Sequence, residues 1–403
     1  MATHDYQIDF PILNPLINDK PIIYLDTACQ SLRPRQVIEA MNRYYTKFPA
    51  CSGRSNHQLA ATVTHLVDEA RQQMARFLGA SRMEEIIFTR NTTEAINLVA
   101  NAYDFQPGDT ILIGNKEHNS NLIPWQMLVK RRGVQLKILH TLTDGSFDLP
   151  GFEQALADGV KLVSFGYTSN LDGVTLPVEQ IIKLAHKRGA LVMLDAAQAA
   201  PQRKINVRAL DVDFLALSGH KILGPSGTGV LYGKYKLLDA MNPFMVGGDT
   251  VATSTYETCE FLPVPEKYEA GLQDYAGIIG LGEAARYLQA VGFDAIQKHE
   301  LLLNKIMTEG TKDMQGLHLI GPADPALRSG IFTFYIDGID SHRIALMLDQ
   351  MANICVRSGQ HCVHSWFNAN GIKGSVRAST YFYNTEEEAE LFVENLKKIR
   401  KVL

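Results

Sequence analysis

The sequence predicts an α/β fold: a large domain with a mostly parallel sheet in an α/β/α sandwich, followed by a small α+β C-terminal domain. Two observations lead to this prediction. Short apolar runs of strand length alternate with helical patterns through the first two-thirds of the chain, the order typical of parallel strands joined by helices. A chain of 403 residues also exceeds the size at which a single compact core stops growing.

Changes of pattern divide the chain into three predicted segments. Residues 1–20 are irregular and contain two prolines, so we expect an N-terminal arm that crosses onto another domain. Residues 21–270 form the predicted large, ligand-binding domain, which ends in a loop-like stretch over 242–274. Residues 271–403 follow as a compact mixture of strands and helices, and with the arm they form the small domain.

Composition and charge argue against several classes of partner. The formal net charge is −4 and basic runs are short, so no nucleic-acid-binding surface is predicted. The N-terminus is polar and no apolar run approaches the roughly 20 residues of a membrane span, so we expect a cytoplasmic protein without a membrane segment. The five cysteines are scattered without a CxxC pair, which favours a reducing compartment and predicts no disulfide framework and no metal site.

The predicted elements follow in order along the chain. A short strand over 21–28 precedes a helix over 34–48, and the next helix, over 59–78, ends at Gly79, a common left-handed cap. Further helices are expected at 122–132, 177–189, 275–291, 293–314, 340–352 and 385–401. The strands of the large sheet are expected near residues 84, 110, 135, 161, 190, 213 and 228.

Polar side chains recur where these predicted strands end. The carboxyl ends of parallel strands meet at one edge of a sheet, where open α/β sheets bind ligands. The polar residues at each strand end have a purely structural explanation when taken alone, but their recurrence at several strand ends favours a single ligand site. The side chains at these exits are Asn91 to Glu94, His118, Asn170, Asp195 with Gln198, and Ser218 to Lys221.

Two neighbouring strand ends carry an acid and a lysine. The run ALVMLD ends in Asp195, and the run DFLALS leads into Ser218, His220 and Lys221. Pyridoxal phosphate (PLP) needs such a pair, a carboxylate against its pyridine nitrogen and a lysine amine, together with donors for its phosphate. Ser218 and His220 are candidate donors. The alternative, in which Asp195 caps a strand and Lys221 is a solvated loop lysine, fits these two short motifs equally well.

Two other strand exits also have two interpretations. Asn91, with Glu94 three residues later, resembles a capping box directly after a strand. Such a helix start exposes N–H groups that suit a phosphate, and Thr92 and Thr93 add hydroxyls. A capped helix without a ligand is the plainer alternative. His118 can stack over a flat ring or serve as a structural histidine.

Three more segments contain candidate functional residues. Arg377, between small residues in SVRAST, can bind a substrate carboxylate through its guanidinium fork. Cys362 lies in the loop RSGQHC, where a thiol is more reactive than in an apolar strand, although a non-catalytic loop thiol is equally compatible. The early loop PACSGRSNHQ holds Arg54 and His57 beside Cys51, and a polar connector is the simpler interpretation of it.

Taken together, these residues resemble the class-V aminotransferase superfamily of fold-type I PLP-dependent transferases. Within it, the chain is similar to the Suf-type cysteine desulfurase and selenocysteine lyase family. The resemblance runs from about residue 20 to the C-terminus. Its most specific motifs here are RNTTEAINLVA, KEHNSNLIPWQ, LDAAQA, DFLALSGHKILGPSGTGVLY, YEAG, GIIGLG, VRSGQHC and VRAST.

The resemblance implies roles around the cofactor. Lys221 would bind PLP covalently and then move the α-proton of the substrate. Asp195 would pair with the pyridine nitrogen, and Gln198 would bond the ring hydroxyl. His118 would stack on the ring as part of the catalytic set. The residues that would hold the phosphate are Thr93, Ser218 and His220, with Thr92 adjacent.

The resemblance also implies a reaction. Arg377 and Asn170 would orient the substrate carboxylate, and Arg54 and His57 match the RxxH of an early active-site loop. Cys362 matches the thiol that takes sulfur from L-cysteine as a persulfide and leaves L-alanine. A homodimer and a sulfur-acceptor protein are implied as partners. The alternatives are a selenocysteine lyase, a Cβ–S lyase, an epimerase, a transaminase or a non-catalytic scaffold.

The chain departs from the family pattern at several places. Gln360 and His361 precede the loop cysteine where two histidines are frequent. Leu272 stands where the family usually has a threonine that the partner subunit gives to the phosphate. Cys29 and Cys51 have no family role, and packing as small apolar side chains is the interpretation we favour for both.

Overall fold

A seven-stranded sheet forms the centre of the larger part of the molecule. The structure is a computed structural model that describes residues 6–16, 20–157 and 159–402. In this described chain, all neighbouring strands of the sheet are parallel except β8, which is antiparallel to both its neighbours. The strand order is β2 (Ile86–Thr89), β8 (Gly229–Gly233), β7 (Phe214–Ser218), β6 (Leu191–Asp195), β5 (Val160–Gly166), β3 (Thr110–Gly114) and β4 (Gln135–Leu139). The predicted α/β class and strand positions are confirmed.

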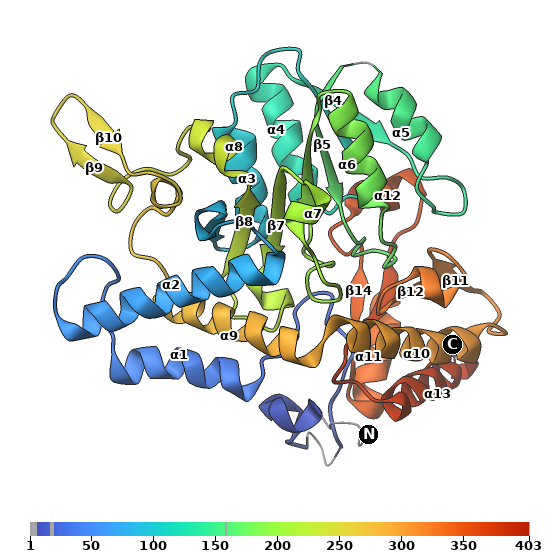
Figure 1. The fold of residues 1–403 in the computed structure, drawn as a ribbon. Helices are drawn as coiled ribbons and strands as arrows, with labels where there is room; N and C mark the ends of the chain where they lie inside the picture. The colour runs from blue at the N-terminus through green and yellow to red at the C-terminus, as the bar shows by residue number, and fades with distance from the viewer. Residues whose placement is uncertain (1–5, 17–19, 158, 403) are drawn as a thin grey trace.

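Helices cover both faces of this sheet, because successive strand residues point into two separate cores. In β3, Leu112 packs into one core while Ile111 and Ile113 pack into the other. One core is covered by α3 (Thr92–Ala102), α4 (Ile123–Arg132) and α8 (Tyr235–Ala240). The other is covered by α2 (Gln58–Leu78), α5 (Leu149–Leu156), α6 (Val178–Lys187), α7 (Val207–Leu210) and α9 (Tyr275–Val291), with α1 (Arg35–Lys47) packed on α9 (Figure 1).

The C-terminal part contains a smaller antiparallel sheet. Within residues 159–402, its strand order is β11 (Leu317–Ile320), β12 (Ile331–Ile336), β15 (Ser375–Ser379) and β14 (Arg357–Gly359). Helices α10 (Phe293–Thr311), α11 (Ser341–Ala352) and α13 (Glu386–Val402) bury its apolar side, and α12 (His364–Ala369) lies beside β11. This is the α+β arrangement that the sequence predicts.

The N-terminal segment crosses onto the C-terminal part. Strand β1 (Ile23–Tyr24) pairs in parallel with β13 (Ile354–Cys355). Before it, the Gln7 amide donates to the backbone of Tyr383 at 3.0 Å. The predicted crossing therefore extends through β1, which the sequence analysis placed in the large domain. Residues 1–5 and 17–19 of the predicted arm lie outside the described residues, and the domain boundary at residue 270 stays a prediction.

The stretch from 242 to 274, expected to be loop-like, contains a β-hairpin. Strands β9 (Val251–Ser254) and β10 (Cys259–Phe261) pair antiparallel and project from the body of the molecule (Figure 1). Most side chains of the hairpin are exposed on both faces. Without a buried face there is no alternation of apolar and polar residues, which is why the sequence pattern did not predict these strands.

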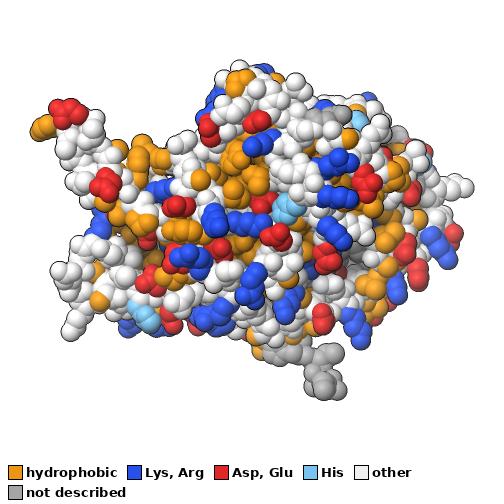
Figure 2. Space-filling model, turned by 45° about the horizontal axis from the view of Figure 1, so that its top comes forward, with side chains coloured by type: hydrophobic (Ala, Val, Ile, Leu, Met, Phe, Trp, Pro, Cys, Tyr) orange, Lys and Arg blue, Asp and Glu red, His pale blue; other side chains and the backbone are white. Residues whose placement is uncertain are grey.

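The surface mixes charges of both signs. Figure 2 shows acidic and basic side chains interspersed over the visible face, with apolar side chains between them. Among the described residues, no helix has the combination of length and hydrophobicity that crossing a bilayer requires.

A buried ion pair joins the edge strand β2 to helix α2 and to the segment that contains Glu269. The Arg71 guanidinium makes two 2.7 Å bonds to the Glu269 carboxylate and one of 2.7 Å to the backbone oxygen of Ile86. Glu269 also accepts a bond from the Phe88 N–H at 2.7 Å. Both charged side chains are buried, so each one depends on the other for its solvation.

Removing one partner of this pair should destabilise the fold strongly. We expect Glu269→Ala to lower the free energy of unfolding by about 3–5 kcal/mol, because Arg71 is left charged and buried. The double variant with Arg71→Met should recover part of that loss. As a control, Glu394→Ala removes an exposed pair with Lys398 and should cost at most about 0.5 kcal/mol. Urea unfolding measures all three, and a double variant less stable than Glu269→Ala would contradict the argument.

Candidate active site

Strand direction brings the predicted site residues to one edge of the large sheet. Strand β8 is antiparallel to β2 and to β7, so β2 and β7 run the same way and end at the same edge as β3, β5 and β6. A cavity of about 240 Å³ opens there, and β14, β15 and the loop before α12 also contribute to its lining. The predicted residues that line it are Thr92, Thr93, His118, Asn170, Asp195, Gln198, Ser218, His220, Lys221, Cys362 and Arg377.

Close packing at this edge explains why residue 229 is a glycine. Gly229 begins β8, and a Cβ atom there would lie 2.7 Å from the Cα of Asn91 and from the backbone oxygen of Leu217. No side chain fits that gap, so glycine lets the start of α3 sit directly against β7. The hydroxyls of Thr92 and Ser218, one from each element, are thereby 2.7 Å apart.

Asp195 and Lys221 form the charged centre of the cavity. Asp195 ends β6, and its Oδ1 accepts from the Ala197 N–H at 2.9 Å. Burial raises the pKa of this carboxyl, and burial lowers the pKa of the Lys221 amine, an effect that the charge of Asp195 opposes. Among the described residues, the Lys221 amine has no hydrogen-bond or ion-pair partner. It is therefore available as a nucleophile.

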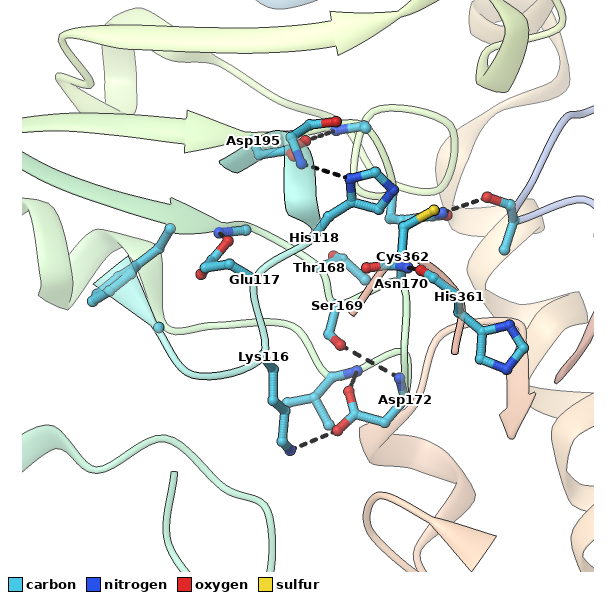
Figure 3. A pocket seen from close by; sticks show the side chains of 18 of the residues that line it. Lys116, Glu117, His118, Thr168, Ser169, Asn170, Asp172, Asp195, His361 and Cys362 are labelled. Carbon is cyan, nitrogen blue, oxygen red and sulfur yellow. Dashed lines mark hydrogen bonds and ion pairs between the residues drawn. The ribbon is translucent and has the colours of Figure 1, made fainter. Parts of the chain in front are cut away.

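His118 is a neutral imidazole in the cavity wall. Burial and the nearby charge of Lys221 lower its pKa to about 3. Its Nδ1 accepts a bond from the Ser120 N–H at 3.0 Å, which assigns the remaining ring proton to Nε2. Figure 3 shows His118 projecting, with Asp195 and Cys362, into the same space. An uncharged flat ring in this position suits stacking on another flat ring.

The start of α3 contributes hydroxyl groups to the lining of the cavity. Asn91 caps the helix by accepting from the Glu94 N–H at 3.0 Å, as predicted. The Glu94 carboxylate, however, accepts from Arg90 rather than from Asn91, so the capping box is shifted by one residue. The Thr93 hydroxyl bonds that of Ser120 at 2.7 Å. These hydroxyls lie at the positive end of a helix and can bind an anion such as a phosphate.

His220, the other predicted phosphate donor, also lines the cavity. Burial and the charge of Lys221 lower its pKa to about 4. Gln198 donates to the backbone oxygen of Ala28 at 2.6 Å, which joins the turn after β1 to the loop after β6. Both side chains line the cavity, and their contacts with a cofactor stay a prediction.

Glu117 is a buried acid that the sequence analysis did not select. Its Oε2 accepts from the Asn121 amide at 2.7 Å and from the Gly166 N–H at 2.9 Å, so it joins the exits of β3 and β5. Burial raises its pKa to about 8. The signal was present, because an acid directly precedes His118 at a strand exit, but its burial depends on partners remote in sequence.

The loop that carries Cys362 has an unusual backbone. His361 and Cys362 both have positive φ, 49° and 60°, which costs about 1–3 kcal/mol for each non-glycine residue. The Asn170 amide holds the His361 oxygen at 2.8 Å, and the Asn119 N–H holds the Cys362 oxygen at 2.8 Å. Here Asn170 therefore positions the thiol loop, a contact additional to its predicted role at a substrate carboxylate.

Arg377 retains free donors although it is almost fully buried. Its Nη1 donates to the backbone oxygen of Asn170 at 2.9 Å, and Nη2 lies 3.7 Å from Asp26. Its Nε has no partner among the described residues. A buried guanidinium with an unused donor beside a cavity is suited to a carboxylate ligand.

Two predicted substrate-binding residues lie outside this cavity lining. Arg54 forms an ion pair with Asp249. The Nδ1 of His57 accepts from the Ala60 N–H at 3.2 Å and caps α2. Their substrate-binding role stays a prediction.

The structure gives different surroundings to Cys29 and Cys51, the two thiols without a family role. Cys51 packs against the large hydrophobic core, as the packing interpretation predicts. Cys29 instead lines the cavity, and its sulfur accepts a bond from Arg357 at 3.1 Å. Arg357, like Glu117, was not selected from the sequence, because only the pairing of β14 with β15 places it beside Arg377.

The fold and this cavity define a class-V aminotransferase type of protein. A family model for the class-V aminotransferases matches residues 23–392, and the chain belongs to that family. It is 38% identical over 408 residues to a probable cysteine desulfurase of Streptomyces coelicolor, with 99% of this chain and 97% of the relative covered. It is 39% identical to the cysteine desulfurase of Dickeya dadantii, with 98% and 96% covered.

Solved structures agree with these relatives. The apo structure of a cysteine desulfurase from Thermococcus onnurineus superposes with a TM-score of 0.94 at 37% identity, and each chain is covered completely. The cysteine desulfurase CsdA from Escherichia coli gives 0.91 at 30% identity, again with complete coverage of both chains. The family resemblance predicted from the motifs is confirmed.

Two buried groups near Cys362 should give opposite pH dependences of stability. Burial lowers the pKa of His361 to about 2, so between that pH and about 6.5 the unfolded chain binds a proton that the folded chain does not. Wild-type stability therefore falls on acidification, by up to about 1.4 kcal/mol per pH unit from this group. We expect His361→Gln to lose less stability than wild type between pH 7 and pH 5 in urea unfolding.

Glu117→Gln is the matched control of opposite sign. With a folded pKa of about 8, Glu117 holds a proton that the unfolded chain releases above about 4.3, so its contribution to stability decreases as pH rises. The stability of Glu117→Gln relative to wild type should therefore increase from pH 5 to pH 8. Parallel pH profiles for the two variants would contradict both assignments.

Proposed function

We propose that this protein is a PLP-dependent cysteine desulfurase that converts L-cysteine to L-alanine and keeps the sulfur on Cys362 as a persulfide for an acceptor. The observation that carries the proposal is the position of Cys362. Its anchored loop brings a thiol to the cavity that also contains Asp195 and Lys221. The names of the relatives, which cover nearly the whole chain, support the same reaction.

The residues present fit PLP. Asp195 ends a strand with a buried carboxylate that can face the pyridine nitrogen, and Lys221 supplies an unpartnered amine. The hydroxyls at the start of α3 and the neutral ring of His118 fit the phosphate and a stacked pyridine. When bound, PLP supplies an electron sink for the electron pair released at the substrate Cα.

Individual side chains of the protein then carry out the separate steps of the reaction. Arg377 binds the substrate carboxylate through its free donors. Lys221, whose amine pKa is lowered by burial, takes the α-proton and can return it. Cys362 forms a bond to the substrate sulfur as the Cβ–S bond breaks, so L-alanine leaves and the enzyme keeps one additional sulfur atom.

Single-turnover experiments on the PLP-loaded protein test this function. Cys362→Ser should reduce L-alanine formation from L-cysteine by about 10³-fold or more and abolish the persulfide, because no thiol receives the sulfur. Cys259→Ser, which changes an exposed thiol on the hairpin, should behave like wild type. Alanine and bound sulfane sulfur are measured together.

Other outcomes identify other reactions. Sulfide with pyruvate, or unchanged cysteine turnover in Cys362→Ser, would sink the desulfurase assignment and favour a lyase. Loss of activity with cysteine but not with selenocysteine in that variant would favour a selenocysteine lyase. A wild-type protein without visible cofactor absorbance after loading would favour a scaffold.

We also propose that the protein acts as a homodimer. Leu272 is 66% exposed, and it follows Gly271, whose N–H bonds the Gly248 oxygen at 2.8 Å. The Arg54–Asp249 ion pair lies in the same surroundings. An exposed apolar side chain near Arg54, a predicted substrate-binding residue, suits an interface that completes the site with residues of a second copy.

A charge at this surface should weaken the dimer. We expect Leu272→Arg to shift the protein toward monomer in light scattering after size-exclusion chromatography, because a desolvated charge has no partner in an apolar contact. Leu327→Arg is the control, since Leu327 is 58% exposed on a different segment. An equal effect of the two substitutions, or none, would contradict the proposed interface.

The compartment is a further part of the proposal. The five cysteines all lie in the described residues and carry free thiols. Free thiols at an active cavity and elsewhere suit a reducing compartment, so we propose a cytoplasmic location.

A further inference from the structure

The turn after β1 places a second thiol in the active cavity. Cys29 and Cys362 both line it, although they lie more than 300 positions apart in the sequence. The turn is fixed on several sides: the Cys29 N–H bonds the Asp26 oxygen at 3.0 Å, and the Ala28 N–H bonds the Ser379 hydroxyl at 2.9 Å. Cys29 therefore occupies a defined position in the lining of the cavity that also contains Cys362.

Two guanidinium groups, those of Arg357 and Arg377, lie near this thiol. Arg357 donates to the Cys29 sulfur at 3.1 Å. Arg357 and Arg377 are directly paired residues of β14 and β15, so their side chains share one face of the sheet, and both line the cavity. Arg377 is 3% exposed and keeps its Nε unpartnered among the described residues. A sulfur atom that receives a hydrogen bond from a cation in an accessible cavity meets the structural requirements of a nucleophile.

The other thiols lack these features. Cys51 packs on the large core, Cys259 is exposed on the hairpin, and Cys355 lies in β13. None of the three lines the cavity. Within the described residues, Cys29 is thus distinguished from them by its access to the space where Cys362 would hold its sulfur.

We propose that Cys29 is a second sulfur-accepting residue, which takes the sulfane sulfur from Cys362 within the same chain. The proposal rests on the proposed function, because Cys362 must first carry a persulfide. The Cys29 thiolate attacks the outer sulfur of Cys362–S–SH, a new S–S bond forms at Cys29, and the bond at Cys362 breaks. Cys362 leaves as a thiolate, so the exchange needs no oxidant or reductant.

This transfer has a consequence for stoichiometry. Once Cys362 is regenerated, it can react with a second L-cysteine while the first sulfur stays on Cys29. Without an acceptor or a reductant, each chain should therefore form about two molecules of L-alanine in the first burst, in place of about one. The Arg357 guanidinium would keep the turn in place by its contact with the sulfur of Cys29.

The test measures the burst and maps the sulfur. PLP-loaded wild type is mixed with excess L-cysteine without reductant, alanine is counted per chain, and the protein is alkylated and digested for mass spectrometry of each cysteine peptide. We expect sulfane sulfur on both Cys362 and Cys29 in wild type. Cys29→Ser should give about half the alanine burst, and Cys51→Ser should keep the wild-type burst.

Each alternative result has a distinct meaning. Sulfur on Cys362 and none on Cys29, or a second sulfur stacked on Cys362, would overturn the transfer while leaving the desulfurase function intact. No sulfur on Cys362 in wild type would overturn the proposed function itself. The mapping on wild type decides between these results even if Cys29→Ser does not fold.

Arg357 provides an independent check. Arg357→Met removes the hydrogen-bond donor to Cys29 and should lower the fraction of sulfur found on Cys29 several-fold in the same mapping, whereas Arg357→Lys should restore part of it. Equal fractions in wild type and Arg357→Met would contradict the role of the guanidinium.

Discussion

The shared direction of strands β2 and β7 is the constraint on which the cavity depends. Because β8 runs against both β2 and β7, those two strands end at the same edge, and the start of α3 meets the end of β7. Gly229 permits that meeting by leaving room for the backbone of Asn91. If β2 ran the other way, the hydroxyl-rich start of α3, which follows it directly, would lie at the opposite edge from Asp195 and Lys221.

Desolvation sets the protonation state of the site as a whole. Burial drives His118, His361 and Lys221 toward their neutral forms, and it raises the pKa of Glu117 in the same wall. Burial also raises the pKa of the Asp195 carboxyl, and the Ala197 N–H and the charge of Lys221 oppose that shift. The lowered pKa of the Lys221 amine suits proton transfer, whereas the low pKa of His118 keeps its ring neutral and able to stack.

Much of this arrangement is predictable from the sequence, because it depends on local order. The strand ends at Asp195 and Ser218, the cap at Asn91 and the glycine after α2 all follow from patterns within a few residues. The hairpin at 251–261 escaped prediction because it has no buried face.

Glu117 and Arg357 escaped prediction for a different reason. The burial of Glu117 is created by Asn121 and Gly166, and the position of Arg357 by its pairing with β15. Such contacts join residues remote in sequence, and no short pattern encodes them. For Cys29, composition favoured packing, and only the turn held by Ser379 and Gln198 turns it toward the cavity.

In the loop that carries the thiol, the strain of a left-handed backbone at His361 and Cys362 is opposed by hydrogen bonds to the loop. The two hydrogen bonds from Asn170 and Asn119 stabilise this conformation of the loop by about 0.5–1.5 kcal/mol each. Relaxing two strained residues returns a free energy of similar size. The two asparagines therefore offset part of the strain, so the place of the Cys362 thiol in the cavity depends on Asn170 and Asn119 as well as on the loop itself.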